Sequence, residues 1–296
     1  MKYVITGSAG NISKPLSERL LAAGHEVTVI GRHKEHLEPL MSKGARAAIG
    51  EVEDIEFLRK AFAGADAVYT MYPPQLAARE LEAYKTQAAT YAAAIQANGI
   101  RYVVNLSSIG AHMPEGCGPV SGLHGAEEEL NKLSEVNVLH LRPGFFYINF
   151  FGNLSMVRDM HIMGNNSGDG SSRIVLSHPA DIAEAVSEAL LDLSFHGHSV
   201  RYLASDERTQ GEVAQVLGAA IGQPQLPWIA FTDEQSFDGM IQAGMPVEMV
   251  KKYVEMGAAM RTGKMWEEYL QHRPSNFGRI KLEDFAKDFA AVYKAG

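Results

Sequence analysis

The sequence of 296 residues contains a single cysteine, Cys117, which cannot form a disulfide within the chain. It also contains no apolar run near the roughly eighteen residues that a membrane-spanning helix needs. A basic and then apolar leader is missing too, because a short apolar strand pattern begins at residue 2. These absences predict a cytoplasmic protein with no membrane partner.

Basic residues are few, with 27 Lys and Arg against 35 Asp and Glu, for a net charge of −8. Binding to nucleic acid or to an acidic membrane surface needs a basic face, so we expect neither. The expected partner is a small-molecule substrate, and the sequence leaves a homodimer open. A hydrophobic content of 46% and a charged content of 21% are typical of an ordered globular chain.

Complete sets of metal ligands are also missing. His33 with His36, and His196 with His198, have a spacing that suits chelation, but no carboxylate or cysteine completes either set. Ser107 lacks the flanking glycines of a nucleophile elbow. We therefore expect neither a metal nor a flavin.

A glycine-containing turn lies within the first sixteen residues, between the strand at residues 2–5 and a helix that runs to residue 23. Glycine allows a sharp bend and a close approach of phosphate to backbone amides, and the helix end favours an anion. Such a turn also joins strands to helices without a ligand, but a second strand at residues 26–30 favours dinucleotide binding. The expected cofactor contacts here are Gly7, Ser8, Gly10, Asn11 and Ile12, with Gly10 nearest the pyrophosphate.

The second strand ends in basic residues. An acidic residue at this place would bind the adenosine ribose of NAD, whereas Arg32 and Lys34 suit the 2′-phosphate of NADPH. The alternative is that both are solvated charges at a helix start. We expect NADP(H) to be preferred over NAD(H).

Strand and helix patterns alternate along the first half, which predicts parallel strands in a Rossmann-type, doubly wound α/β fold. Because ligands bind at the carboxyl ends of such strands, residues there are expected to contact the cofactor: Glu51, Val52, Met71, Tyr72, Ser107, Pro143 and Phe145. The next aromatic residues, Phe146 and Tyr147, are expected to contact substrate. The loop at 110–122 is interpreted either as a lid or as a solvated connection.

The last third differs, with a turn cluster at residues 164–170 and helical patterns that predominate after it. We predict a Rossmann domain at 1–150 and a smaller, mainly helical, substrate-capping part at 151–296, with the helix at 179–193 packing back on the first domain. Further elements are expected at 66–72, 75–98, 101–106, 123–134, 136–141, 200–204, 209–221, 233–243, 246–256 and 282–294.

Several motifs together resemble one known family. They are Thr6-Gly7-Ser8-Ala9-Gly10-Asn11-Ile12, Gly31-Arg32, Gly50-Glu51-Val52-Glu53-Asp54, Asn105-Leu106-Ser107-Ser108, His124 with Glu128, Leu141-Arg142-Pro143-Gly144 and His178-Pro179-Ala180-Asp181-Ile182-Ala183. In this order they are similar to the NmrA-like group of atypical short-chain dehydrogenase/reductases, and within it to the NAD(P)H:quinone oxidoreductase branch. The resemblance implies a Rossmann domain, NADPH binding and hydride transfer to a quinone.

The sequence departs from typical short-chain dehydrogenases, which use a Tyr-x-x-x-Lys pair on one helix face for proton transfer. No such pair occurs here, and His124 and Glu128 take the two places. His124 is a candidate proton donor, with a packing role as the alternative. Two functions therefore stay open, a reductase for a quinone or similar electrophilic carbonyl compound and an NADP(H)-sensing regulator without turnover.

Overall fold

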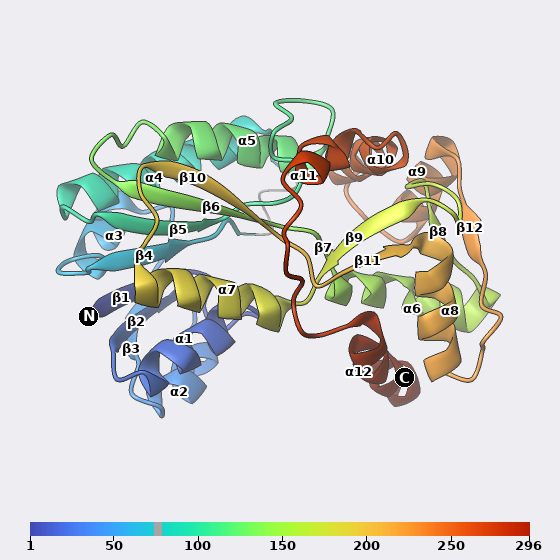
Figure 1. Cartoon of the computed structure of the whole chain (residues 1–296), viewed down its shortest axis with the longest axis horizontal. Coiled ribbons are helices and arrows are strands. Elements are labelled where there is room, and N and C mark those ends of the chain that lie inside the picture. Colours follow the sequence, from blue (N-terminus) through green and yellow to red (C-terminus); the bar gives the residue numbers. More distant parts are fainter. Residues whose placement is uncertain (74–78) are drawn as a thin grey trace.

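The computed structural model describes residues 1–73 and 79–296. Within them, a seven-stranded parallel sheet forms one side of the molecule and two small sheets form the other (Figure 1). The strand order is β10-β6-β5-β4-β1-β2-β3. The bounds are β1 (Lys2–Ile5), β2 (Glu26–Gly31), β3 (Arg46–Ile49), β4 (Ala67–Thr70), β5 (Tyr102–Leu106), β6 (Asn137–Pro143) and β10 (His198–Leu203). The predicted Rossmann-type fold is confirmed.

Strand β1 lies at the point where the strand order reverses. It pairs with β2 on one side, where Ile5 is opposite Val29, and with β4 on the other, where Ile5 is opposite Tyr69. Every residue of β4 is buried, as expected for a strand covered on both faces. Ligands of open α/β sheets bind at such a reversal, beyond the carboxyl ends of the strands.

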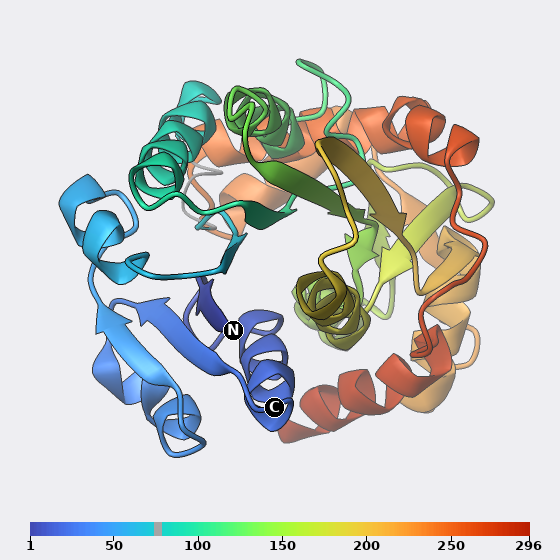
Figure 2. The same cartoon turned by 60° about the vertical axis from the view of Figure 1, so that its left-hand side comes forward.

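Helices cover both faces of the large sheet (Figures 1 and 2). One face carries α1 (Ser13–Ala22), α2 (Lys34–Met41) and α7 (Pro179–Asp192) over an apolar core that includes Leu16, Leu37 and Ile182. The other carries α3 (Ile55–Ala61), α4 (Glu82–Ala97) and α5 (Pro119–Leu130) over a second core that includes Leu58. Asp54 caps α3 by accepting hydrogen bonds from the amides of Glu56 and Phe57 at 2.9 and 3.2 Å.

The rest of the chain surrounds a third core that includes Phe150, Phe285 and Phe289. Its strands are short: β7 (Phe145–Phe146), β9 (Arg173–Ser177) and β11 (Asp206–Thr209) in one sheet, and β8 (Met163–Asn165) and β12 (Trp228–Ala230) in the other. Its helices are η2 (Tyr147–Asn153), α6 (Leu154–Met160), α8 (Gln210–Ala220), α9 (Asp233–Gln242), α10 (Val247–Arg261), η3 (Lys264–Trp266), α11 (Glu267–Gln271) and α12 (Leu282–Ala295). None of these five strands was predicted, because strands this short have too little periodicity to show in a sequence.

The chain crosses between the two parts more than once. Helix α7 packs against α1, as predicted, and β10 then completes the large sheet by pairing with β6, from His198 opposite Val138 to Leu203 opposite Pro143. The large sheet therefore draws on residues from both sides of the predicted boundary at 150.

Two predicted boundaries shift. Helix α5 begins at Pro119 instead of 123, so part of the predicted loop at 110–122 is helical, with proline in the first turn where its missing N–H costs nothing. Helix α4 begins at Glu82, and the predicted start near residue 75 lies outside the described residues. In the described ranges, no helix combines the length and apolar character needed to cross a membrane.

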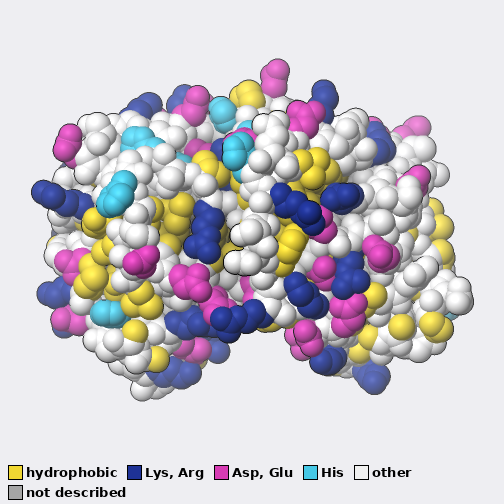
Figure 3. Space-filling view, in the orientation of Figure 1, with side chains coloured by type: hydrophobic (Ala, Val, Ile, Leu, Met, Phe, Trp, Pro, Cys, Tyr) yellow, Lys and Arg dark blue, Asp and Glu magenta, His cyan; other side chains and the backbone are white. Residues whose placement is uncertain are grey.

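Charged side chains of both signs are interspersed over the face in Figure 3, and neither sign gathers there.

Candidate functional site

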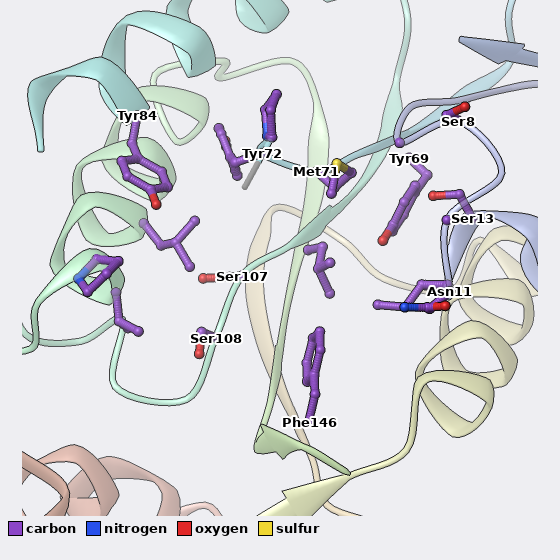
Figure 4. Close-up of a pocket in the computed structure, with 18 of the residues that line it drawn as sticks. Ser8, Asn11, Ser13, Tyr69, Met71, Tyr72, Tyr84, Ser107, Ser108 and Phe146 are labelled. Carbon is purple, nitrogen blue, oxygen red and sulfur yellow. The ribbon is translucent and has the colours of Figure 1, made fainter. Parts of the chain in front are cut away.

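A cavity of about 650 Å³ opens at the carboxyl ends of the large sheet's strands. It runs from the turn after β1 to side chains from α4, α5, β7 and α10 (Figure 4). Its volume is in the range of cofactor sites. Thirteen of the predicted site residues line it: Gly7, Ser8, Gly10, Asn11, Ile12, Arg32, Glu51, Val52, Met71, Tyr72, Ser107, Phe145 and Phe146.

The turn after β1 uses left-handed backbone at Gly7, with φ +91°, and at Ser8, with φ +56°. The Ser8 amide donates to Ile30 O at 2.9 Å, which ties the turn to β2. A Cβ on Gly7 would lie 2.6 Å from Ser13 Oγ, whereas one on Gly10 would meet only Gly7 O, at 3.1 Å. Gly7 is therefore required by the fold, while Gly10 keeps the cavity surface open.

Helix α1 begins directly beside this turn. Among the described residues, the amides of Asn11, Ile12 and Ser13 have no hydrogen-bond partner, and all three residues line the cavity. Free amides at a helix N-terminus, together with the positive end of the helix dipole, attract an anion. This end of the cavity suits a pyrophosphate.

The charged side chains that line the cavity, within the described residues, are Arg32 and Glu51. Arg32 follows the end of β2, is exposed, and makes no hydrogen bond or ion pair with the described residues. Lys34, the first residue of α2, is exposed but does not line the cavity. Of the two predicted cations, Arg32 therefore lines the cavity and Lys34 does not.

At the opposite end of the cavity, the described lining carries no charge and is rich in apolar and aromatic groups. Its lining comes from Tyr72, Tyr84, Val120, Leu123, Phe145, Phe146, Ile148, Tyr253, Met256 and Met265. Burial and the nearby Tyr253 raise the pKa of Tyr84, so its hydroxyl stays protonated, and it points into the cavity (Figure 4). Sequence reasoning missed Tyr84, Tyr253 and both methionines, because they are far from the strand ends in the sequence.

A buried ion pair lies behind Ser107. The Ser107 hydroxyl donates to Glu127 Oε1, and Arg142 donates to both oxygens of Glu127, at 2.9 and 2.6 Å. Arg142 also donates to Tyr202 Oη at 2.9 Å and to Glu268 Oε2 at 3.0 Å. Burial alone would lower the pKa of Arg142, but the hydrogen bonds and charge of Glu127 outweigh it and raise that pKa. This network fixes Ser107 and joins β6 to α11.

His140 lies two residues before Arg142 on β6. Its Nδ1 accepts from the Asn105 amide at 3.1 Å and its Nε2 lies 2.9 Å from Asn131 Oδ1. Burial is the largest cause that lowers the pKa of His140, to about 4. The imidazole is therefore neutral near pH 7.

Four predicted site residues do not line the cavity. His124 Nδ1 lies 2.9 Å from Ala111 O and its Nε2 lies 3.6 Å from Glu128, on a partly exposed face of α5. Tyr147 is fully buried and stacks on Phe285, because η2 turns it into the C-terminal core. Pro143 is buried within β6, and Lys34 is exposed at the start of α2. The predicted contacts of these four residues with cofactor or substrate thus have no support from the cavity's geometry.

Metal ligands do not gather in the part of the chain that the structure describes, where no group of three or more His, Cys, Asp or Glu side chains could hold an ion. Cys117 is buried, and burial raises its pKa to about 12, so it stays a thiol.

Comparisons with known proteins agree with this geometry. A family model described as NAD(P)H-binding matches residues 7–193. A (4-alkanoyl-5-oxo-2,5-dihydrofuran-3-yl)methyl phosphate reductase of Streptomyces griseus is 23% identical over 263 residues, covering 88% of this chain and 87% of that protein. An uncharacterized protein of Schizosaccharomyces pombe is 38% identical over 68 residues, which span only 23% of its length.

Two solved structures share the fold over almost the whole chain. A triphenylmethane reductase from Citrobacter sp. aligns with a TM-score of 0.79 and 18% identity, covering 98% of this chain and 100% of the other. An NADPH-dependent quinone oxidoreductase from Escherichia coli, complexed with NADPH, aligns with a TM-score of 0.77 and 18% identity, covering 97% and 99%. The NAD(P)H-binding fold that the motifs indicated is confirmed. Since the family model covers more than half of the chain, including the turn after β1, the protein belongs to the NAD(P)H-binding family.

Proposed function

We propose that the protein is an NADPH-dependent oxidoreductase that reduces a quinone or a similar small electrophilic carbonyl compound. The observation that carries this proposal is the two-ended cavity, with unpartnered amides and one cation at one end and an uncharged aromatic lining at the other. The first end suits a dinucleotide and the second an uncharged, flat substrate.

The choice of NADPH depends on Arg32. A guanidinium with no partner among residues 1–73 and 79–296 offers a planar fork for a phosphate, and no acidic side chain stands in its place directly after β2. Glu51 follows β3, the neighbour of β2 in the sheet, and so lines the cavity on the same side as Arg32.

The nature of the substrate follows from the far end of the cavity. The described lining there carries no charge, so a phosphorylated substrate, such as that in the name of the Streptomyces griseus relative, would find no cation to pair with. Phe145 and Phe146 offer aromatic surfaces for a ring to stack on.

Bound NADPH supplies the hydride in such a reaction. The chain's part is to hold donor and acceptor together at the apolar end. We propose that the protonated Tyr84 hydroxyl donates a hydrogen bond to the substrate's carbonyl oxygen and that water supplies the proton, since His124 does not reach the cavity.

The competing function is an NADP(H) sensor without turnover. The position of His124 outside the cavity favours it, because neither a Tyr-Lys pair nor this histidine is then available as an acid. Incubation of the pure protein with NADPH and a panel of quinones, followed by NADPH absorbance, separates the two. Oxidation well above the uncatalysed rate supports the reductase, and binding of NADPH with no acceptor reduced supports the sensor.

Gly10→Val is the control for this assay. The added side chain would enter the cavity without contacting the core, so we expect NADPH affinity to fall more than a hundredfold while the protein stays folded. Calorimetric titration and thermal unfolding measure the two effects. Gly7→Val serves for comparison, because its positive φ and the close Ser13 Oγ predict misfolding instead. Normal NADPH affinity in Gly10→Val would remove the turn from the cofactor site.

A further inference from the structure

Tyr69 has an unusual environment for its hydroxyl group. In the part of the chain that the structure describes, five tyrosines are fully buried: Tyr3, Tyr69, Tyr91, Tyr147 and Tyr269. Four of these hydroxyls donate to a protein acceptor, namely Leu190 O, Met71 O, Ile280 O and Glu207 Oε1. The Tyr69 hydroxyl is also buried but has no partner among the described residues.

A buried hydroxyl without a partner costs free energy that phenylalanine at the same place would avoid. The ring of Tyr69 belongs to the apolar core beneath α1 and α7, which phenylalanine would fill equally well. Burial, and then the nearby Tyr91, raise the pKa of Tyr69, so the group remains a hydrogen-bond donor. The hydroxyl therefore needs an acceptor from outside the protein.

The cavity is where such an acceptor would bind. Tyr69 lines it, and Figure 4 shows the hydroxyl on the side of Asn11, in the space between the turn and Phe146. In the sheet, β4 lies next to β1 on the side away from β2 and β3. Arg32 and Glu51, which mark the adenosine end, are on that opposite side.

We propose that Tyr69 Oη donates a hydrogen bond to an oxygen in the nicotinamide half of the bound dinucleotide, either of its ribose or of the adjoining phosphate. This inference depends on the cofactor binding of the proposed function but not on the identity of the substrate. Tyr69 is then a binding residue whose hydroxyl is satisfied only in the complex.

The test is Tyr69→Phe, measured by calorimetric titration and thermal unfolding. NADPH affinity should fall about tenfold, the effect of one lost hydrogen bond in a buried site. Adenosine 2′,5′-bisphosphate, which lacks the nicotinamide half, should bind with unchanged affinity. The melting temperature of the free protein should stay the same or rise, because an unsatisfied group has been removed.

Tyr3→Phe is the matched control. Tyr3 lies in the same core, but its hydroxyl donates to Leu190 O at 2.9 Å, so this variant should melt at a lower temperature and bind NADPH normally. Unchanged NADPH affinity in Tyr69→Phe, or equal weakening of both ligands, would overturn the inference. A wild-type protein that binds NADPH but reduces no quinone would overturn only the reductase, and the Tyr69 result would still stand.

Discussion

Strands β2 and β6 end at the same edge of one sheet, and an arginine lies at each end. Arg32 directly follows β2, and Arg142 lies within β6. Arg32 after β2 is exposed, lines the cavity and has no partner in the described chain, whereas Arg142 in β6 is buried and bonds to Glu127, Glu268 and Tyr202. In the region around Arg32, which we call the open region, the side-chain donors are available to a ligand. In the region around Arg142, which we call the closed region, the protein itself accepts the hydrogen bonds of the arginine. Unsatisfied donors, more than charge, therefore mark the binding end of this site.

The largest expected effect comes from breaking the closed region. Arg142→Met leaves Glu127 buried without its partner, so the free energy of unfolding should fall by about 3–5 kcal/mol in denaturant titration. Replacing both partners, as Arg142→Met with Glu127→Leu, should recover much of that loss. Arg32→Met is the control and should change stability by less than about 0.5 kcal/mol. An equal loss of unfolding free energy in the two arginine variants would contradict the distinction between the two regions.

Lowering the pH should destabilise the closed region through protonation of His140. The unfolded chain takes up a proton there near pH 6.5, but burial delays uptake in the folded chain until about pH 4. The contribution of His140 to the free energy of unfolding is therefore fully present above pH 6.5. It should fall as the pH is lowered toward 4, by up to about 1.4 kcal/mol per pH unit. His140→Gln should flatten this slope in urea titrations at several pH values, while the exposed His196→Gln should not.

Cofactor affinity tests the open region around Arg32. Arg32→Ala should lower NADPH affinity by about 1.5–3 kcal/mol through loss of charged hydrogen bonds to the 2′-phosphate, and leave NADH affinity nearly unchanged. Titration of both cofactors measures this. Equal weakening of both, or an NADH preference in the unmodified protein, would show that Arg32 does not select the phosphate.

The smallest effect is expected at Lys34. Its side chain is exposed and does not line the cavity, so Lys34→Ala should change NADPH affinity by less than about 0.5 kcal/mol. A loss as large as that of Arg32→Ala would instead place the phosphate over the first turn of α2.

The sequence predicts the large sheet well because its signals are local. The apolar strand patterns and the turn after β1 each act within a few residues. It predicts residues of the cavity lining where they lie in the turn after β1 or close behind another strand, as with Arg32 and Ser107. The unpaired hydroxyl of Tyr69 and the Arg142–Glu127 pair depend on what the folded chain brings beside them, which no local pattern states. Tyr147, predicted to contact substrate, lies in the C-terminal core, since the turn of η2 decides which aromatic side chain faces the cavity.

The late return of the chain to the large sheet also bears on how the protein is made. Strand β6 ends at Pro143, and its neighbour β10 begins only at His198, after the chain has built β7, β8, β9 and α7. At synthesis rates of about 5–20 residues per second, the edge of β6 stays unpaired for roughly 3–12 s as the chain emerges. An unpaired edge can pair with other chains, so fragments that end near residue 150 should aggregate, whereas fragments that extend beyond Leu203 close the sheet.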